Sequence, residues 1–221
     1  MNASMTRFRI ALAAALLAVP AVAPLGAQAW MYPSFQMPRV TPREMNFALA
    51  DAGNLGTSLL FQWRQGQGVR SQLSFDVGVT DINNAGPANG DQQLLLLGGQ
   101  FAHQLARSTA DMPFDLLLTA GVNAALGDGS VFRVPVGLSV GHRFPIEGGA
   151  ALTPFVHPRL VYSHCGRCSD PSDLGLEFDL GGEFEFNSAF ALRLSASLGN
   201  NYFTNDDSFG ASLAWHPGRR R

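Results

Sequence analysis

The stretch LGLEFDLGGEFEF, residues 174–186, decides the fold because its residues alternate between two kinds at every step. One parity is apolar with a single glycine, and the other holds glycine together with Glu177, Asp179, Glu183 and Glu185. Side chains of a β-strand point alternately to opposite faces of the sheet. The period of two therefore predicts a strand with one apolar face and one charged face.

The same alternation recurs along the chain, with glycine- and asparagine-rich turn signals between the segments. No helical period of useful length accompanies it, and short links between strands favour antiparallel hairpins. Pro154 and Pro158 remove ladder donors, so we expect their strand to be bulged or locally unpaired. The sequence predicts an all-β, closed up-and-down barrel of ten strands, with eight strands as the alternative if the first pair lies outside the wall. Besides 174–186, the predicted strands are residues 45–50, 59–64, 73–80, 92–106, 114–126, 132–144, 151–163, 190–199 and 208–215.

The N-terminal residues have the organisation of a secretory signal peptide. Arg7 and Arg9 precede an apolar run that ends in the small-residue sequence Ala27-Gln28-Ala29, and this order is typical of a cleaved export signal. We expect residues 1–29 to be the signal peptide and residues 30–43, which are rich in proline, to be an extended lead-in. The barrel then comprises residues 44–216, and residues 217–221 form a basic tail.

Composition indicates which way the apolar face points. Charged residues make up 14% of the chain, against about 25% in a typical globular domain. The 221 residues contain no lysine, and the formal net charge is −2, which argues against a nucleic-acid partner. A membrane barrel turns its apolar face outward, whereas a soluble lipocalin-like barrel encloses it around an apolar ligand. We predict the membrane arrangement and keep the soluble periplasmic barrel as the alternative.

The last predicted strand carries a pattern with a known counterpart. Ser208, Gly210, Leu213 and Trp215 follow the order polar–x–Gly–x–x–apolar–x–aromatic, which resembles the C-terminal assembly signal of bacterial outer-membrane β-barrel proteins. The architecture is similar to that of small barrels of the OmpA/OmpX type. The resemblance implies export to the outer membrane of a Gram-negative envelope, contact with outer-membrane lipid, and recognition by periplasmic chaperones and the barrel insertion machinery. This chain continues past the aromatic residue, whereas the family pattern ends on it.

An inward-facing polar parity would enclose charges in the lumen. Hairpin register places Arg159 opposite Glu177 and His157 opposite Asp179, and the next hairpin brings Glu183 near Arg193. Such pairing offsets much of the cost of burying charge. The network is interpreted first as structural filling and second as a polar path for small solutes. Its predicted members are Arg133, Arg143, His157, Arg159, Glu177, Asp179, Glu183, Glu185 and Arg193.

The two cysteines of the chain lie close together in a predicted loop. Cys165 and Cys168 are expected to form a disulfide, because an exported chain passes through an oxidising compartment. Two alternatives stay open: a metal site that adds His164 and Asp170 to the cysteines, and a redox-active C-x2-C pair.

The sequence indicates a surface or structural role, with a narrow, porin-like pore as a further option. We expect no enzymatic activity, no catalytic residues, no cofactor and no resident metal. The oligomeric state stays open, with a monomer expected. A third option is an envelope lipid-modifying enzyme at the rim of the barrel, for which His157, Glu177 and Asp179 are the residues to substitute.

Overall fold

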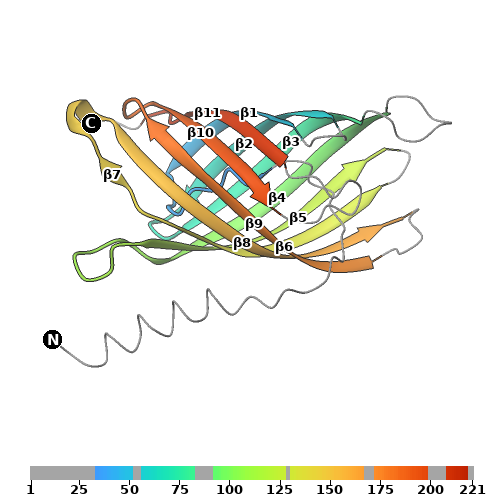
Figure 1. Cartoon of the computed structure of the whole chain (residues 1–221), viewed down its shortest axis with the longest axis horizontal. Coiled ribbons are helices and arrows are strands. Elements are labelled where there is room, and N and C mark those ends of the chain that lie inside the picture. Colours follow the sequence, from blue (N-terminus) through green and yellow to red (C-terminus); the bar gives the residue numbers. More distant parts are fainter. Residues whose placement is uncertain are drawn as a thin grey trace, which may run out of the picture.

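The computed structural model describes residues 33–51, 56–82, 92–127, 130–166, 172–198 and 208–218. Strands account for almost all of them (Figure 1), and one short 3-10 helix, η2 (Glu147–Gly149), lies beside them. Among the described residues, no helix has the length and apolar character needed to cross a membrane. The strands are β1 (Arg43–Asp51), β2 (Thr57–Gln67), β3 (Ser71–Ile82), β4 (Gln92–Ala106), β5 (Asp115–Leu126), β6 (Val131–Gly141), β7 (Phe144–Pro145), β8 (Ala151–Cys165), β9 (Ser172–Glu185), β10 (Phe190–Leu198) and β11 (Ser208–Trp215).

Neighbouring strands of the sheet pair antiparallel, and the sheet closes on itself. Two pairings complete the circle: β1 with β11, where Met45 lies opposite Trp215, and β6 with β8. The fold is therefore a closed ten-stranded antiparallel barrel, as predicted, and the eight-stranded alternative is wrong. The short β7 adds no wall position, because it continues β6 along β8 in the same register after an interruption at His142 and Arg143.

The prolines of β8 disturb one of its two ladders. Pairing with β9 runs without interruption through Pro154 and Pro158, whereas pairing with β6 omits Pro158 and His157. Proline lacks the N–H that a ladder needs, so the loss is local to one side. The expectation of local unpairing is confirmed, but no register shift follows. An actual irregularity lies in β4, between Gln104 and Ala106.

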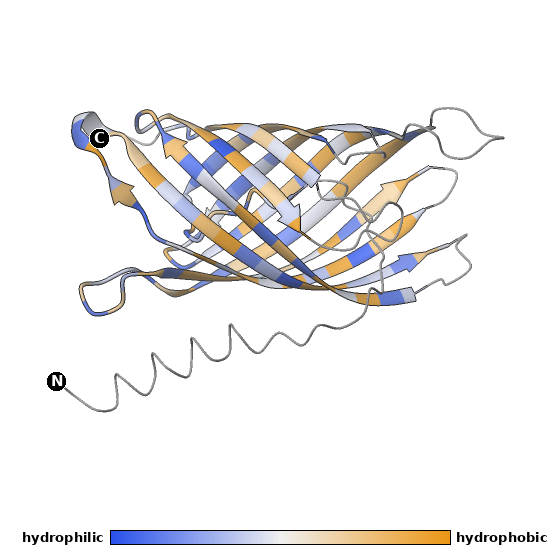
Figure 2. Ribbon diagram, in the orientation of Figure 1, coloured by the Kyte–Doolittle hydropathy of each residue, from blue (hydrophilic) through white to orange (hydrophobic). Residues whose placement is uncertain are grey.

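The outer wall is apolar and the interior is polar. Leu176 and Leu194 are 58% and 46% exposed on the outside, whereas Arg133 and Arg193 are at most 1% exposed inside. Figure 2 shows the alternation of hydrophilic and hydrophobic residues along each strand. A soluble barrel that holds an apolar ligand needs the opposite arrangement, so the structure argues against that alternative.

The two ends of the barrel differ. We call the end where β1 begins and β11 ends the terminal end; it carries the β7 segment in Figure 1. Toward the opposite end, the lumen holds an apolar cluster that includes Leu60, Leu94, Leu96 and Val131, all at most 5% exposed. The apolar run at the start of β4 therefore contributes to both faces, with Leu94 and Leu96 inside and alternate leucines outside.

Candidate functional site: the filled lumen

Residues 33–42, which we call the plug segment, run from inside the barrel to its terminal end, where Pro42 is exposed. They belong to the predicted lead-in, and their sequence carries no periodic signal that indicates this position. Phe35, Gln36 and Met37 are at most 4% exposed. The segment forms no strand, so its buried backbone groups need partners from the wall, because an unpaired buried amide or carbonyl costs free energy.

The deepest contacts of the plug segment involve Ser34. Its amide donates to Oδ1 of Asp179 at 3.2 Å, and its hydroxyl lies 2.7 Å from Nδ1 of His157. Its carbonyl accepts a hydrogen bond from the hydroxyl of Ser195 at 2.7 Å. Three strands, β8, β9 and β10, thus hold one residue.

The middle of the plug segment is held through its carbonyl groups. The carbonyl of Phe35 accepts from Nη2 of Arg64 at 3.1 Å and from Nη1 of Arg193 at 3.4 Å. The hydroxyl of Ser139 donates to the carbonyl of Gln36 at 2.9 Å. Hydrogen bonds from charged donors are stronger than neutral ones. The two arginines therefore satisfy the carbonyl of Phe35 and hold this part of the plug segment in place.

Two glutamines of the wall bind the part of the plug segment nearest the terminal end. Gln104 acts in both directions, since Nε2 donates to the carbonyl of Pro38 at 2.9 Å and Oε1 accepts from the amide of Val40 at 3.0 Å. Gln72 accepts from the amide of Thr41 at 2.9 Å. Both glutamine side chains are buried. These two buried glutamines therefore supply hydrogen-bond partners to the backbone of the plug segment.

Gly210 gives the plug segment room. A Cβ at this position would lie 2.7 Å from the ring of Phe35 and 3.1 Å from Ala50, closer than a side chain tolerates. Gly210 is also the glycine of the predicted C-terminal assembly signal. The structure therefore supplies a packing reason for a small residue at this point of β11, in addition to any role in recognition.

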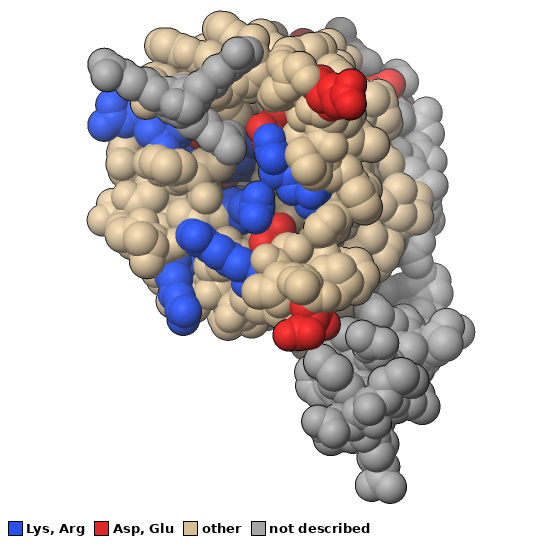
Figure 3. All heavy atoms as spheres, turned by 90° about the vertical axis from the view of Figure 1, so that its left-hand side faces the viewer, with Lys and Arg blue, Asp and Glu red and all other residues tan. Residues whose placement is uncertain are grey.

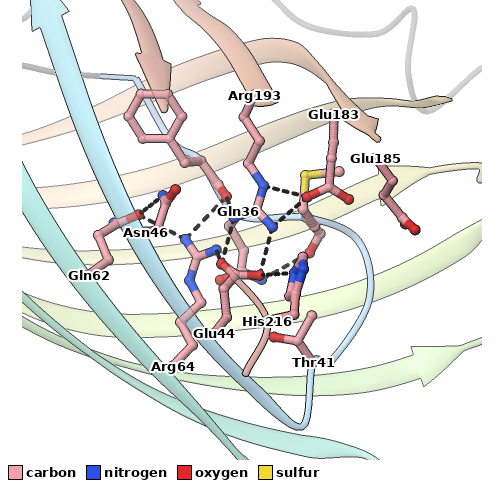
Figure 4. Close-up of polar contacts among 12 residues, drawn as sticks. Gln36, Thr41, Glu44, Asn46, Gln62, Arg64, Glu183, Glu185, Arg193 and His216 are labelled. Carbon is pink, nitrogen blue, oxygen red and sulfur yellow. Dashed lines mark hydrogen bonds and ion pairs between the residues drawn. The ribbon is translucent and has the colours of Figure 1, made fainter. Parts of the chain in front are cut away.

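Glu44 is the centre of the charged interior (Figure 4). It is 0% exposed, and its carboxylate contacts Arg64 at 2.6 Å, Arg193 at 2.6 and 2.7 Å, and Nε2 of His216 at 3.0 Å. Arg193 in turn binds Glu183 at 2.5 Å. Residues from β2 and β10 and the residue after β11 thus meet at one carboxylate of β1, and β9 joins them through the contact of Glu183 with Arg193.

A second chain of ion pairs lies nearer the opposite end. Glu177 contacts Arg133 and, at 3.0 Å, Arg159. Arg159 also binds Asp179 at 2.7 Å, and Asp179 is the residue that holds the amide of Ser34. All of these side chains are buried. Buried charges need such partners because isolated ones are costly.

Two further ion pairs lie at the terminal end. Arg143 forms a two-pronged contact with Glu185 at 2.8 and 2.9 Å, and this hydrogen bonding raises the pKa of Arg143. Arg39 of the plug segment binds Asp115 at 2.9 Å. The plug segment is therefore tied to the wall by an ion pair as well as by hydrogen bonds.

The predicted lumen residues and the observed ones overlap but differ at the centre. The register pairs Arg159 with Glu177, His157 with Asp179 and Arg193 with Glu183, as the hairpin argument predicted. The members missed by sequence reasoning include Glu44 and Arg64, the two residues that bring β1 and β2 into the network. Glu44 stood outside the predicted first strand, which began one residue later, and a longer reading of the alternation in residues 43–51 would have found it.

A serine, a histidine and an aspartate meet in the lumen without forming a catalytic triad. Asp179 binds the backbone amide of Ser34 rather than the ring of His157. The second ring nitrogen of His157 faces the hydroxyl of Thr119 at 2.9 Å. The ring thus links the plug segment to β5. His157, Glu177 and Asp179 lie at most 4% exposed in the interior, not at the rim where the lipid-modifying alternative placed them.

The predicted disulfide and metal residues lie at the end of β8. Cys165 is buried and disulfide-bonded, whereas Cys168 and Asp170 lie outside the described residues. His164 is exposed, with Nδ1 3.0 Å from the hydroxyl of Ser172. The described residues contain no group of three or more potential metal ligands. The pairing of Cys165 with Cys168 stays a prediction.

Mass spectrometry tests the cysteine pair directly. The intact exported chain is expected to gain 2 Da on reduction, and a peptide containing both cysteines should react with a thiol reagent only after reduction. The small ring contributes at most about 2 kcal/mol through loop entropy, so Cys168→Ser should lower the free energy of unfolding by no more than that amount. Two reactive thiols in the chain as isolated would contradict the pairing.

Comparisons with known proteins find similarity at the level of architecture. The chain matches no protein-family model and no curated protein. Among solved structures it is similar to LpxR from Salmonella typhimurium, with a TM-score of 0.46 and 9% sequence identity, over 78% of this chain and 99% of that chain. The likeness concerns the fold alone. The predicted membership of the OmpA/OmpX type gains no support from a family match.

One expectation needs correction after this comparison. The expectation of no enzymatic activity is corrected by LpxR, an outer-membrane barrel that is an enzyme. The barrel architecture gives no ground for expecting the absence of catalysis. At 9% identity the likeness transfers no residue role and no activity to this chain.

Proposed function

We propose that this protein is an integral outer-membrane barrel whose lumen is closed by its own plug segment, with a surface or structural role in the envelope. The observation that carries the proposal is the position of residues 33–42, which lie across the lumen with their backbone bonded to wall side chains from several strands. An open diffusion pore needs a continuous aqueous path instead. This barrel is narrow and filled with side chains and backbone.

The outer surface supports the membrane part of the proposal. Apolar side chains such as Leu160, Leu176 and Phe209 are at least 50% exposed around the wall. Soluble proteins rarely expose apolar patches larger than a few hundred Å², whereas lipid satisfies such a surface. Closure of the sheet satisfies the other requirement, because hydrocarbon offers no partner to a free strand edge.

The interior supports closure by two means. On the polar side, ion pairs such as Glu44 with Arg193 occupy the cross-section around the plug segment. Toward the opposite end, Leu60, Leu94 and Leu96 form an apolar constriction with Phe35 of the plug segment. Apolar constrictions oppose permeation because they exclude water. A narrow pore is therefore the less favoured form of the proposal.

The remaining partners follow from the same proposal. Export depends on the predicted signal peptide, and insertion on the predicted contacts of Ser208, Gly210, Leu213 and Trp215 with the assembly machinery. In the orientation usual for this class, the terminal end faces the periplasm. The protein acts as a monomer in contact with outer-membrane lipid.

A gel-mobility assay tests the membrane barrel. The exported chain is expected in the membrane fraction and to migrate faster unheated than heated, because a closed barrel resists detergent. Leu176→Arg places a charge on the lipid face and should destabilise the folded form by about 2–4 kcal/mol if position 176 lies near the bilayer midplane, with Ser172→Arg near the strand end as the control. Recovery in the soluble fraction without detergent would contradict the proposal. Full-length protein should also be silent in planar bilayers.

A further inference from the structure

A cavity of about 320 Å³ opens at the terminal end, and its charged lining consists of three arginines and two glutamates, Glu183 and Glu185. Arg39, Arg107 and Arg143 line it, and they come from three separate parts of the chain: the plug segment, the link after β4 and the link after β6. Figure 3 faces this end and shows basic side chains gathered around and within a central hollow, with acidic groups between them. The cavity adjoins the ion pairs of Glu44, because Glu183 and His216 line it, and it is separate from the contacts of Ser34.

The charges at this cavity are arranged in depth. Arg39 is 41% exposed while its partner Asp115 is 0% exposed, and Arg143 is 26% exposed while Glu185 is 6% exposed. In both pairs the guanidinium is the more exposed partner, and it is therefore the more accessible one to a solute. Glu185 also lines the cavity, whereas Asp115 does not. Each guanidinium presents several N–H donors, and one carboxylate does not use them all.

Arg107 adds a cation without a carboxylate partner among the described residues. Its Nη2 donates to the carbonyl of Val69 at 2.6 Å, which positions the guanidinium without neutralising it. Arg43 and Arg70 are exposed at the same end, together with Asp111 and Glu147, so the cation that distinguishes the cavity itself is Arg107.

A buried histidine completes the lining. His216 is 3% exposed and lines the cavity, with Nε2 on Glu44 at 3.0 Å. Its Nδ1 has no hydrogen-bond partner within the part of the chain that the structure describes. A buried polar atom without a partner is costly, and a water or the P–OH group of a bound phosphate at the cavity floor would supply one.

We propose that this cavity is a binding site for a small soluble oxyanion of the phosphate class, such as inorganic phosphate or a phosphate monoester. Arginine forks match phosphate oxygens with two parallel hydrogen bonds, and the cavity volume accommodates a phosphate with a few attached atoms. Because Arg39 belongs to the plug segment, the bound anion also holds the plug segment in place. The site is independent of the proposed function, since a closed barrel needs no ligand.

Calorimetric titration of the folded full-length chain in zwitterionic detergent tests the site. Inorganic phosphate and glycerol 3-phosphate are expected to bind saturably, and Arg107→Gln and Arg143→Gln should each weaken binding about tenfold or more. Arg43→Gln is the matched control, because this exposed arginine bonds to Gln65 at the same end and does not line the cavity. All variants are first checked for the heat-modifiable folded form.

The outcomes separate the possible sources of the anion. A tenfold loss in the two cavity variants with an unchanged control supports the site. No saturable binding, or an equal loss in Arg43→Gln, overturns it, the latter because diffuse surface charge would explain the result. Binding of phosphatidylglycerol micelles without binding of free phosphate also overturns it, because the ligand would then be a lipid headgroup. None of these results alters the gel shift or the silent bilayer that test the proposed function.

Discussion

A chain that lacks residues 33–40 is expected to conduct ions in planar bilayers under conditions in which the full-length protein is silent. The deletion removes Phe35, Gln36 and Met37 from the lumen, and with them the backbone groups that Gln104, Ser139 and Ser195 bind. Water would replace them along the polar wall. The currents should be small, because a ten-stranded barrel is far narrower than porins of about 16–18 strands.

The matched controls separate filling from folding. Replacing residues 33–40 by glycine and serine keeps the chain length and should give intermittent openings. Gly210→Leu leaves the plug segment intact but pushes against the ring of Phe35, which lies 2.7 Å from the position of a Cβ, and should open the barrel partially. Both variants must keep the heat-modifiable band. Silence in all of them would show that the ion-paired side chains alone close the lumen.

Glu44→Gln is expected to lower the free energy of unfolding by about 3–5 kcal/mol, the cost of breaking a buried ion pair from one side. The carboxylate meets Arg64, Arg193 and His216 at 3.0 Å or less. Without it, the two arginines keep only Glu183 as a carboxylate partner among the contacts described, through Arg193. Urea titration followed by gel mobility measures the shift in midpoint.

Two neighbouring substitutions calibrate that result. Arg43→Gln lies one residue away on the exposed side and should change stability by less than about 0.5 kcal/mol. Glu44→Ala adds the loss of packing and should destabilise at least as much as Glu44→Gln. A change below about 1 kcal/mol in Glu44→Gln would mean that water already compensates this part of the interior.

The wall of the barrel could be predicted because its information is local. In β9 apolar and polar residues alternate, so the type of each residue indicates the face of the sheet on which it lies. The short hairpins then fix which residues lie opposite each other, and the sequence therefore predicts that Arg159 pairs with Glu177. The end of β6 could not be predicted, since nothing in the sequence of residues 132–144 marks the interruption at His142. The low content of charged residues predicts that the apolar face points outward, because a wall in contact with lipid needs few charges.

The plug segment could not be predicted because its partners are distant in sequence. Ser34 bonds to His157, Asp179 and Ser195, more than 120 positions away. A proline-rich stretch without alternation reads the same whether it lies in water or in a lumen. The contact of Glu44 with Arg64 lies within the β1–β2 hairpin, but its contact with Arg193 of β10 forms only after β1 and β11 have joined.

The order of the chain has a consequence for how the molecule is built. The plug segment is synthesised before every strand that binds it, and its last wall partners, Arg193 and Ser195, belong to the penultimate strand. The pairing between β1 and β11 forms only after those partners have been synthesised. Either the plug segment already lies in the partly formed barrel when the final hairpin is added, or it enters the lumen afterwards through the arginine-lined opening at the terminal end. Closure of the sheet and entry of the plug segment are thus coupled steps of assembly. Any factor that keeps β1 and β11 apart during membrane insertion also sets the time available for the plug segment to enter the lumen.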